Sequence, residues 1–289
     1  MEIKVRVPGS CGELVQGTLC KEPFLVTCPI DMYTTVCAKT GSGKNHGLGR
    51  KALAAKRKAL EYLRQKEYPY DLFLSSDLPR GKGMASSSAD IAAVILAVAA
   101  SLGKYISPRQ IAKIAAAIEP TDGIFYHGIV CLNQMTGKVY ETFHHMPPLY
   151  ILIFDHGGTV NTMAFHQQRM DLPEQFADAE KWAQALALVK KKDPVSLGQA
   201  ATLSARLHQL ILPKENLEEI LTLALACGAV GINAAHSGTV IGLLFAPDAA
   251  RENRQLAIQK MQQAFPNWQY LREARLIAGG YQIKKNRRL

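Results

Sequence analysis

The stretch Pro79-Arg80-Gly81-Lys82-Gly83-Met84-Ala85-Ser86-Ser87-Ser88-Ala89 lies between two apolar segments. Strand-forming residues precede it at 70–74, and an alanine-rich run long enough for a buried helix follows at 91–102. A glycine loop that leads into a helix leaves several N–H groups unpaired at the positive end of the helix dipole. Gly81 and Gly83 let the backbone approach a phosphate, and the serine hydroxyls can bind phosphate oxygens or Mg²⁺. The stretch predicts a phosphate-binding loop.

The same residues could instead form a serine-rich turn that only caps the helix, because Ser is a favourable N-cap residue. They do not form a Walker A loop, since Lys82 is followed by Gly83 rather than Ser or Thr. A second glycine-rich segment, 41–44, lacks the glycine spacing and the following hydroxyl of that loop. We interpret segment 41–44 as part of a solvated loop or of a basic flap near a nucleotide.

Two carboxylates lie three residues apart in Glu119-Pro120-Thr121-Asp122-Gly123, at the end of a predicted helix. An exposed Glu followed by an Asp-Gly turn is the plainer interpretation. Phosphoryl transfer, however, needs carboxylates to hold a metal ion and to orient the attacking hydroxyl. Beside a phosphate loop, Glu119 and Asp122 are therefore candidates for those two roles.

The hydrophobic pattern predicts both helices and strands. In the first half we expect strands at 1–7, 24–28 and 33–38, a glycine-punctuated turn at 8–17, helices at 51–65 and 108–118, and a hairpin of 129–132 with 138–143. In the second half we expect strands at 149–154, 229–233, 239–245 and 269–277, and helices at 174–191, 196–209, 214–226 and 248–264. The second half has the β-α-β-β-α-β order of ferredoxin-like domains, with extra helices in the first crossover. The predicted fold is α+β, divided near Pro147 into domains 1–147 and 148–289.

Composition narrows the class of protein. The chain has 289 residues, of which 48% are hydrophobic and 20% charged, as in an ordinary soluble globular protein. No apolar stretch spans a membrane, and the first residues do not form a signal peptide. The six cysteines show no Cys-x-x-Cys pair or Cys/His ligand spacing, so we expect reduced thiols in a cytoplasmic protein.

The net charge of +10 raises the alternative of a nucleic-acid-binding protein. The basic residues are dispersed apart from 190–192 and 284–288, and cations at a helix C-terminus are explained by the helix dipole. A positive field also promotes capture of an anionic small molecule such as ATP. We therefore expect neither a nucleic-acid nor a membrane partner, and the oligomeric state is left open.

The order of residues in the predicted loop resembles the phosphate loop of the GHMP kinases (galacto-, homoserine, mevalonate and phosphomevalonate kinases). Pro79, Gly83, Met84, Ala85, Ser86, Ser87 and Ala89 fill its pattern, and Ser88 stands where many members have Ala. Segment 230–240 resembles the third motif of the family, with Ala-Ala-His-Ser-Gly replacing its run of glycines. The resemblance implies an N-terminal βα domain with the phosphate loop, a C-terminal ferredoxin-like domain, and ATP with Mg²⁺ in the cleft between them.

The resemblance also implies roles for individual residues. ATP and its phosphates would contact Pro79, Gly81, Gly83, Met84, Ala85, Ser86, Ser87 and Ser88. Mg²⁺ would contact Ser87 and Glu119, Asp122 would orient and deprotonate the acceptor hydroxyl, and Lys82 would stabilise the phosphoryl charge. The candidate substrate-binding residues are Ser10, Cys11, Glu13, Asp31, His236, Ser237 and Gly238.

Further motifs point to a subgroup of the family. Segments 8–17, 28–33 and 155–162, together with Glu-Pro-Thr-Asp, resemble family members that phosphorylate the side-chain hydroxyl of L-threonine. That likeness implies formation of L-threonine O-3-phosphate and ADP, for the aminopropanol linker of cobalamin. A carboxylate should bind the ammonium group of threonine, with Glu13 and Asp31 as candidates. The alternatives are another small alcohol such as homoserine, or a non-catalytic GHMP-fold protein that binds a ligand.

Overall fold

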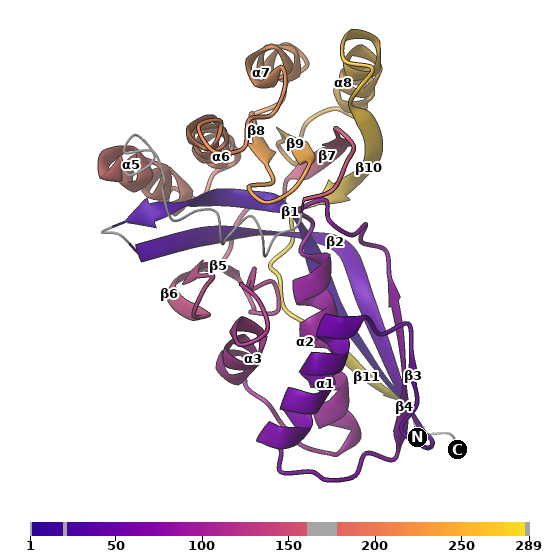
Figure 1. Cartoon of the computed structure of the whole chain (residues 1–289). Coiled ribbons are helices and arrows are strands. Elements are labelled where there is room, and N and C mark those ends of the chain that lie inside the picture. The colour runs from indigo at the N-terminus through magenta and orange to yellow at the C-terminus, as the bar shows by residue number, and fades with distance from the viewer. Residues whose placement is uncertain (1, 20–21, 161–177, 287–289) are drawn as a thin grey trace.

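The computed structural model describes residues 2–19, 22–160 and 178–286, which form two layered units built around a pair of long strands (Figure 1). These strands are β1 (Glu2–Leu19) and β2 (Glu22–Thr40), which pair antiparallel. One end of the pair belongs to the first sheet, and the other end lies beneath the helices of the second unit (Figure 1). The phosphate-loop stretch lies near the bend between the two ends.

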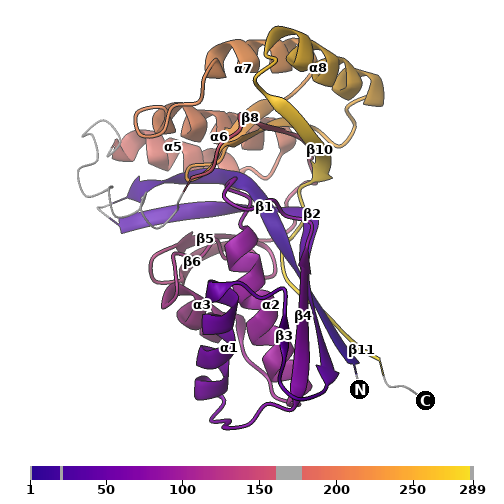
Figure 2. The same ribbon diagram turned by 45° about the vertical axis from the view of Figure 1, so that its right-hand side comes forward.

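The first sheet has the order β11-β1-β2-β4-β3, and β5 and β6 continue it from β2. Its other strands are β3 (Asn45–His46), β4 (Tyr70–Ser76), β5 (Ile129–Asn133), β6 (Lys138–Phe143) and β11 (Gln282–Asn286). Three helices lie on one face of this sheet: α1 (Arg50–Tyr62), α2 (Ser86–Ser101) and α3 (Pro108–Ala116) (Figure 2). Alternate residues of β1, namely Ile3, Val5 and Val7, are buried toward these helices, as period-2 alternation requires.

Helix α2 is buried almost all round, which explains its continuous apolar sequence. It begins at Ser86, inside the serine run, rather than at the first residue of the apolar run. Helix α3, predicted at 108–118, starts with a capping box, in which Ser107 and Gln110 satisfy each other's backbone N–H groups.

The predicted turn at 8–17 is wrong, because β1 continues through it. Register shifts at Pro8/Gly9, Ser10/Glu13 and Glu13/Val15 accommodate the proline and glycines as β-bulges. Gly12 has a φ of +51°, a conformation that favours glycine. The strands predicted at 24–28 and 33–38 are likewise one strand, β2. The bulges bend the strand pair, so residues that resemble a turn in sequence mark the bend.

The second unit has a four-stranded antiparallel sheet with the order β10-β7-β9-β8. Its elements are β7 (Tyr150–Asp155), α5 (Ala179–Lys190), α6 (Pro194–His208), α7 (Leu217–Ala226), β8 (Gly231–Ala234), β9 (Val240–Phe245), α8 (Arg251–Ala264) and β10 (Gln269–Arg275). This is the predicted element order; residues 174–177 of the first predicted helix lie outside the described residues.

The sheet of the second unit is buried on both faces. Leu152 and Phe154 of β7 pack in a core with α7 and α8. Ile151 and Ile153, which point to the opposite face, join the core that contains β1 and α2. The two units are therefore continuous through one hydrophobic core.

Strand β11 returns to the first sheet and pairs antiparallel with β1, for example Val5 with Ile283. Both ends of the described chain consequently lie at the same edge of the molecule (Figure 2). The division at Pro147 stays a proposal, in which the second domain contributes this strand to the first sheet. None of the described helices is long and apolar enough to cross a membrane.

Trp182 joins α5 to the long strands. Its side chain is fully buried, its indole meets Phe24 edge-on with centroids 6.0 Å apart, and a Cβ on Gly17 would approach the indole to 2.4 Å. We expect Trp182→Ala to lower the free energy of unfolding by about 3–5 kcal/mol, because it leaves a large cavity. Urea unfolding followed by circular dichroism would measure this. Gln184→Ala, at an exposed position of α5, is the control, and equal midpoints for the two variants would contradict the prediction.

Candidate active site

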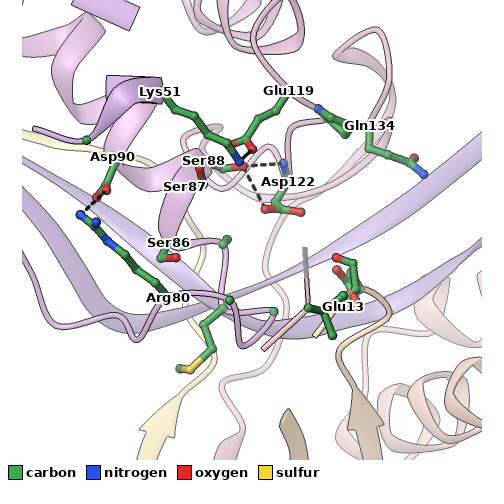
Figure 3. A pocket seen from close by; sticks show the side chains of 18 of the residues that line it. Glu13, Lys51, Arg80, Ser86, Ser87, Ser88, Asp90, Glu119, Asp122 and Gln134 are labelled. Carbon is green, nitrogen blue, oxygen red and sulfur yellow. Dashed lines mark hydrogen bonds and ion pairs between the residues drawn. The ribbon is translucent and has the colours of Figure 1, made fainter. Parts of the chain in front are cut away.

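A cavity of about 330 Å³ lies where the phosphate loop, the start of α1 and the carboxylate segment meet (Figure 3). Of the residues predicted from sequence, the structure brings together around it Glu13, Gly81, Gly83, Met84, Ala85, Ser86, Ser87, Ser88, Glu119, Asp122 and Ser237. These residues come from β1, the loop before α2, the first turn of α2, the segment after α3 and the turn between β8 and β9. Segments far apart in sequence therefore form one site.

The loop is held by its carbonyl groups. The four successive carbonyls of residues 81–84 accept hydrogen bonds from the N–H groups of Val160 (3.0 Å), Thr239 (3.0 Å), Gly12 (3.0 Å) and Ser10 (3.1 Å), in that order. A trans peptide unit points its N–H away from its carbonyl, so the N–H groups of residues 82–85 turn to the opposite side. The free N–H groups of the first turn of α2 add to these and favour an anion.

Three residues of the loop have a positive φ: Gly81 (+72°), Gly83 (+80°) and Ala85 (+54°). The conformation of Ala85 is unfavourable for a residue with a Cβ, and Ala85 is the N-cap of α2. The left-handed residues reverse the chain so that α2 starts at the cavity.

The turn between β8 and β9 packs directly on the loop. A Cβ on Gly238 would lie 2.2 Å from the carbonyl oxygen of Lys82, and a Cβ on Gly83 would lie 2.3 Å from the Cβ of Ala235. Only glycine fits at this contact. Gly238 thus acts on the shape of the loop, while its neighbour Ser237 lines the cavity.

The two carboxylates of the segment after α3 have different surroundings. Glu119 is buried and forms an ion pair with Lys51 through Oε2, while its Oε1 has no hydrogen-bond partner among the described residues. Asp122 accepts a hydrogen bond from the Ser88 hydroxyl (3.0 Å). Burial, reinforced by the charge of Glu13, raises the pKa of Asp122 to about 7. The serine that departs from the family pattern therefore orients Asp122.

Lys82 lies behind the loop rather than in the cavity lining. Its ammonium group pairs with Asp155 (2.6 Å) and donates to the carbonyl of Gly158 (2.7 Å). Asp155 also accepts a hydrogen bond from the Thr239 hydroxyl (2.5 Å), so it ties the loop to the second unit. Pro79 is likewise not a lining residue.

The cations that line the cavity are Arg50, Lys51 and Arg80. None of the three was predicted from the sequence as a site residue, although the basic flap expected near residue 44 leads into Arg50 and Lys51. Arg80 lies 3.7 Å from Asp90, whose other oxygen accepts a hydrogen bond from Thr34 (2.8 Å). Gln16, Leu25 and Gln134 also line the cavity without having been predicted.

The remaining candidate substrate residues lie elsewhere. Ser10 supports the loop through its N–H, and the fully buried Cys11 faces Asn233 across the junction of the units. Asp31 is exposed and accepts a hydrogen bond from the N–H of Arg275 (2.8 Å), away from the cavity. His236 is buried behind Glu13. Asn161 and Thr162, the last residues of the motif at 155–162, lie outside the described residues.

Comparisons with known proteins agree with this geometry. The GHMP kinases N terminal domain matches residues 52–129, and the GHMP kinases C terminal domain matches residues 185–264. The chain is 32% identical to an L-threonine kinase of Salmonella typhimurium, over 96% of this chain and 94% of that protein. It is also 32% identical to an L-threonine kinase of Citrobacter freundii, over 82% of this chain and 84% of that protein.

Solved structures share the fold. A mevalonate kinase superposes with a TM-score of 0.73 at 14% identity, covering 94% of this chain and 98% of its own. A putative homoserine kinase from Listeria monocytogenes superposes with a TM-score of 0.68 at 18% identity, covering 98% of this chain and all of its own. At these identities the likeness concerns the fold alone.

Gly83→Ala should sharply weaken ATP binding, because its Cβ would collide with Ala235 and displace the loop. Gly103→Ala is a matched control: Gly103 also has a positive φ (+67°), but a Cβ there meets nothing within 4 Å. Both variants carry the backbone strain of roughly 1–2 kcal/mol, and only the first has the collision. Calorimetric titration with ATP would measure the difference. Equal ATP affinities in the two variants would show that the contact does not shape the loop.

Proposed function

This chain belongs to the GHMP kinase family, and on that basis we propose that it transfers the γ-phosphoryl group of ATP to the side-chain hydroxyl of L-threonine, giving L-threonine O-3-phosphate and ADP. As a family member it is a small-molecule kinase that uses ATP. The choice of threonine is supported by the 32% identity to L-threonine kinases over nearly the whole chain. The observation that carries the proposal is the meeting, in one cavity, of the phosphate loop with Asp122 and Glu13.

The triphosphate of ATP is proposed to bind residues 79–88. The N–H groups turned away from the tethered carbonyls would bind its oxygens, and Ser86 and Ser87 would add their hydroxyls. Arg50 and Arg80 line the same cavity and would offset the remaining negative charge. Lys82 was predicted to act on the phosphoryl group directly. Its pairing with Asp155 favours a role in fixing the loop until ATP binds.

The residues present fit a Mg²⁺ ion. Glu119 has a buried carboxylate oxygen without a partner, and Ser87 lines the same cavity. The described part of the chain contains no group of three or more His, Cys, Asp or Glu side chains that could hold a metal ion. Mg²⁺ is commonly held by one or two protein oxygens together with substrate phosphates, so a dedicated cluster is not required. We propose Glu119 and Ser87 as its protein ligands, with the ion neutralising charge on the phosphates.

Asp122 is proposed to orient the threonine hydroxyl and to accept its proton. The carboxylate lines the cavity, and Ser88 fixes its orientation. Loose phosphoryl-transfer transition states require little early deprotonation, so orientation is the larger part of this role. The proton leaves late, as the bond to phosphorus forms.

Of the two candidates for the ammonium group of threonine, Glu13 has the better position. It lines the cavity in which Asp122 also lies, whereas Asp31 is exposed and bound to the backbone of Arg275. Leu25 lines the cavity as well and offers an apolar contact. We propose that Glu13 binds the ammonium group.

The resemblance to threonine-phosphorylating members further supports a role for the product in the aminopropanol linker of cobalamin, and a cytoplasmic location. Homoserine is the second candidate acceptor, because it also carries an ammonium group and a side-chain hydroxyl. The homoserine kinase structures share the fold at only 18–20% identity and do not favour homoserine over threonine.

The test of the proposed function is release of ADP with a panel of hydroxy amino acids at saturating ATP and Mg²⁺. We expect L-threonine to give the highest kcat/KM, with homoserine and serine well below it, and L-threonine O-3-phosphate as the product. A higher kcat/KM for homoserine than for threonine would make homoserine the substrate instead. ATP binding without turnover of any acceptor would favour a ligand-binding protein.

Asp122→Asn should lower kcat with threonine by about 10²–10⁴-fold while the KM for ATP stays close to that of the wild type. Glu119→Gln should instead raise the Mg²⁺ concentration that gives half-maximal activity. Steady-state kinetics at varied ATP and Mg²⁺ would separate the two effects. A nearly normal kcat in Asp122→Asn would mean that the proton leaves by another route, for instance to the γ-phosphate.

A further inference from the structure

A chain of buried hydrogen bonds lies directly behind Glu13 and joins β1 to α6 and to the turn between β8 and β9. Its members are Gln16, Ser204 and His236, each at most 3% exposed. The backbone N–H of Gln16 donates to the Ser204 hydroxyl oxygen (3.0 Å), and Ser204 Oγ lies 3.3 Å from His236 Nε2. On the other side of the ring, His236 Nδ1 lies 3.0 Å from Gln16 Oε1 and 3.2 Å from Glu13 Oε2.

The donors and acceptors of this chain have a fixed direction. A backbone N–H can only donate, so Ser204 accepts from Gln16. An amide oxygen can only accept, so His236 Nδ1 carries a hydrogen and donates to Gln16 Oε1, while Nε2 and Ser204 Oγ share a hydrogen bond on the other side of the ring. Glu13 Oε2 lies 3.2 Å from the same Nδ1, within ion-pair distance, and accepts a hydrogen bond from the backbone N–H of His236 (3.1 Å).

The backbone N–H and the Nδ1 edge of His236 thus both face one oxygen of Glu13. That oxygen is Oε2, and Glu13 itself lines the cavity, so Oε1 is the oxygen that can face an acceptor. The buried cation nearby, Lys214, donates to the carbonyl of Gly238 (2.7 Å) and supports the adjacent turn. Asp122 lines the same cavity, and a second carboxyl group beside Glu13 favours a cation there.

We infer that His236, with its ring fixed by Ser204, is a positioning residue that holds the Glu13 carboxylate toward the ammonium group of the acceptor. This inference rests on the proposed function, since it concerns the acceptor site of that reaction. It assigns His236 a role behind the cavity instead of the direct substrate contact predicted from sequence. It also gives Ser204, which no sequence motif selected, a role in acceptor specificity.

Two substitutions of the histidine separate its two hydrogen bonds. The side-chain amide nitrogen of Asn can occupy the position of Nδ1 and keep a donor beside Gln16 Oε1 and Glu13 Oε2, whereas Gln reaches the position of Nε2 and keeps only the Ser204 side. The readout is the ratio of kcat/KM for L-threonine to that for 3-hydroxybutyrate, which lacks the ammonium group. A loss of general stability would not change this ratio.

We expect His236→Gln to lower the ratio roughly tenfold or more, as for loss of a polar contact with a charged group, with an unchanged KM for ATP. His236→Asn should keep most of the wild-type ratio. The ratio for Ser204→Ala should lie between those of His236→Gln and His236→Asn. Thr202→Val is the matched control on α6, because within the described ranges the Thr202 hydroxyl bonds only the backbone of Ile232 in β8. It should lower the thermal midpoint and leave the ratio unchanged.

A wild-type ratio in correctly folded His236→Gln would overturn the inference while the threonine kinase activity stands. If the wild type instead prefers homoserine, the proposed substrate fails. The positioning role is then judged in the same variants by the ratio of kcat/KM for homoserine to that for 4-hydroxybutyrate. Loss of that ratio in His236→Gln supports the inference, and its retention overturns it.

Discussion

The site depends on backbone hydrogen bonds that hold the carbonyl groups of residues 81–84. Two of the donors belong to β1, one follows β7, and two lie at the start of β9, so both units of the protein hold the same loop. Since carbonyl and N–H groups of a trans peptide point in opposite directions, fixing the carbonyls on the outside presents the N–H groups on the inside. The affinity of the loop for an anion therefore follows from how the two units pack. The Asp155 carboxylate strengthens this arrangement by joining Lys82 to Thr239.

Charge is distributed unequally along the cavity. Arg80 belongs to the loop and faces Asp90, apart from Glu13 and Asp122, whose carboxyl groups lie where the acceptor is proposed to bind (Figure 3). Lys51, at the start of α1, pairs with Glu119. A polyanion and a cationic amino acid would thus each meet charge of opposite sign, and their reacting groups would be brought together by the protein field. Such preorganised electrostatics is usually the largest contribution of an enzyme to catalysis.

The local sequence was sufficient wherever local rules decide the structure. The Ser107 capping box, the hairpin of β5 and β6 and the order of elements along the second unit follow from patterns within a few residues of each other. The turn predicted at 8–17 failed because a bulged strand and a turn use the same proline and glycines, and only pairing with β2 distinguishes them. Lys51 and Gln134 were missed for a different reason. Nothing near them in sequence shows that they lie on one cavity, because packing of α1 and β5 against distant strands brings them there.

The return of β11 to β1 has a consequence for the order of folding. Val5 pairs with Ile283, so one edge of the first sheet is completed by a segment that leaves the ribosome long after β1. Until then, β1 has an unpaired edge, which is the kind of surface that promotes association between chains. Contacts so distant in sequence also close slowly, because loop-closure entropy precedes any gain from pairing. The first sheet can therefore be finished only after the second unit has been synthesised, and a nascent chain halted near Pro147 would expose the edge that β11 covers.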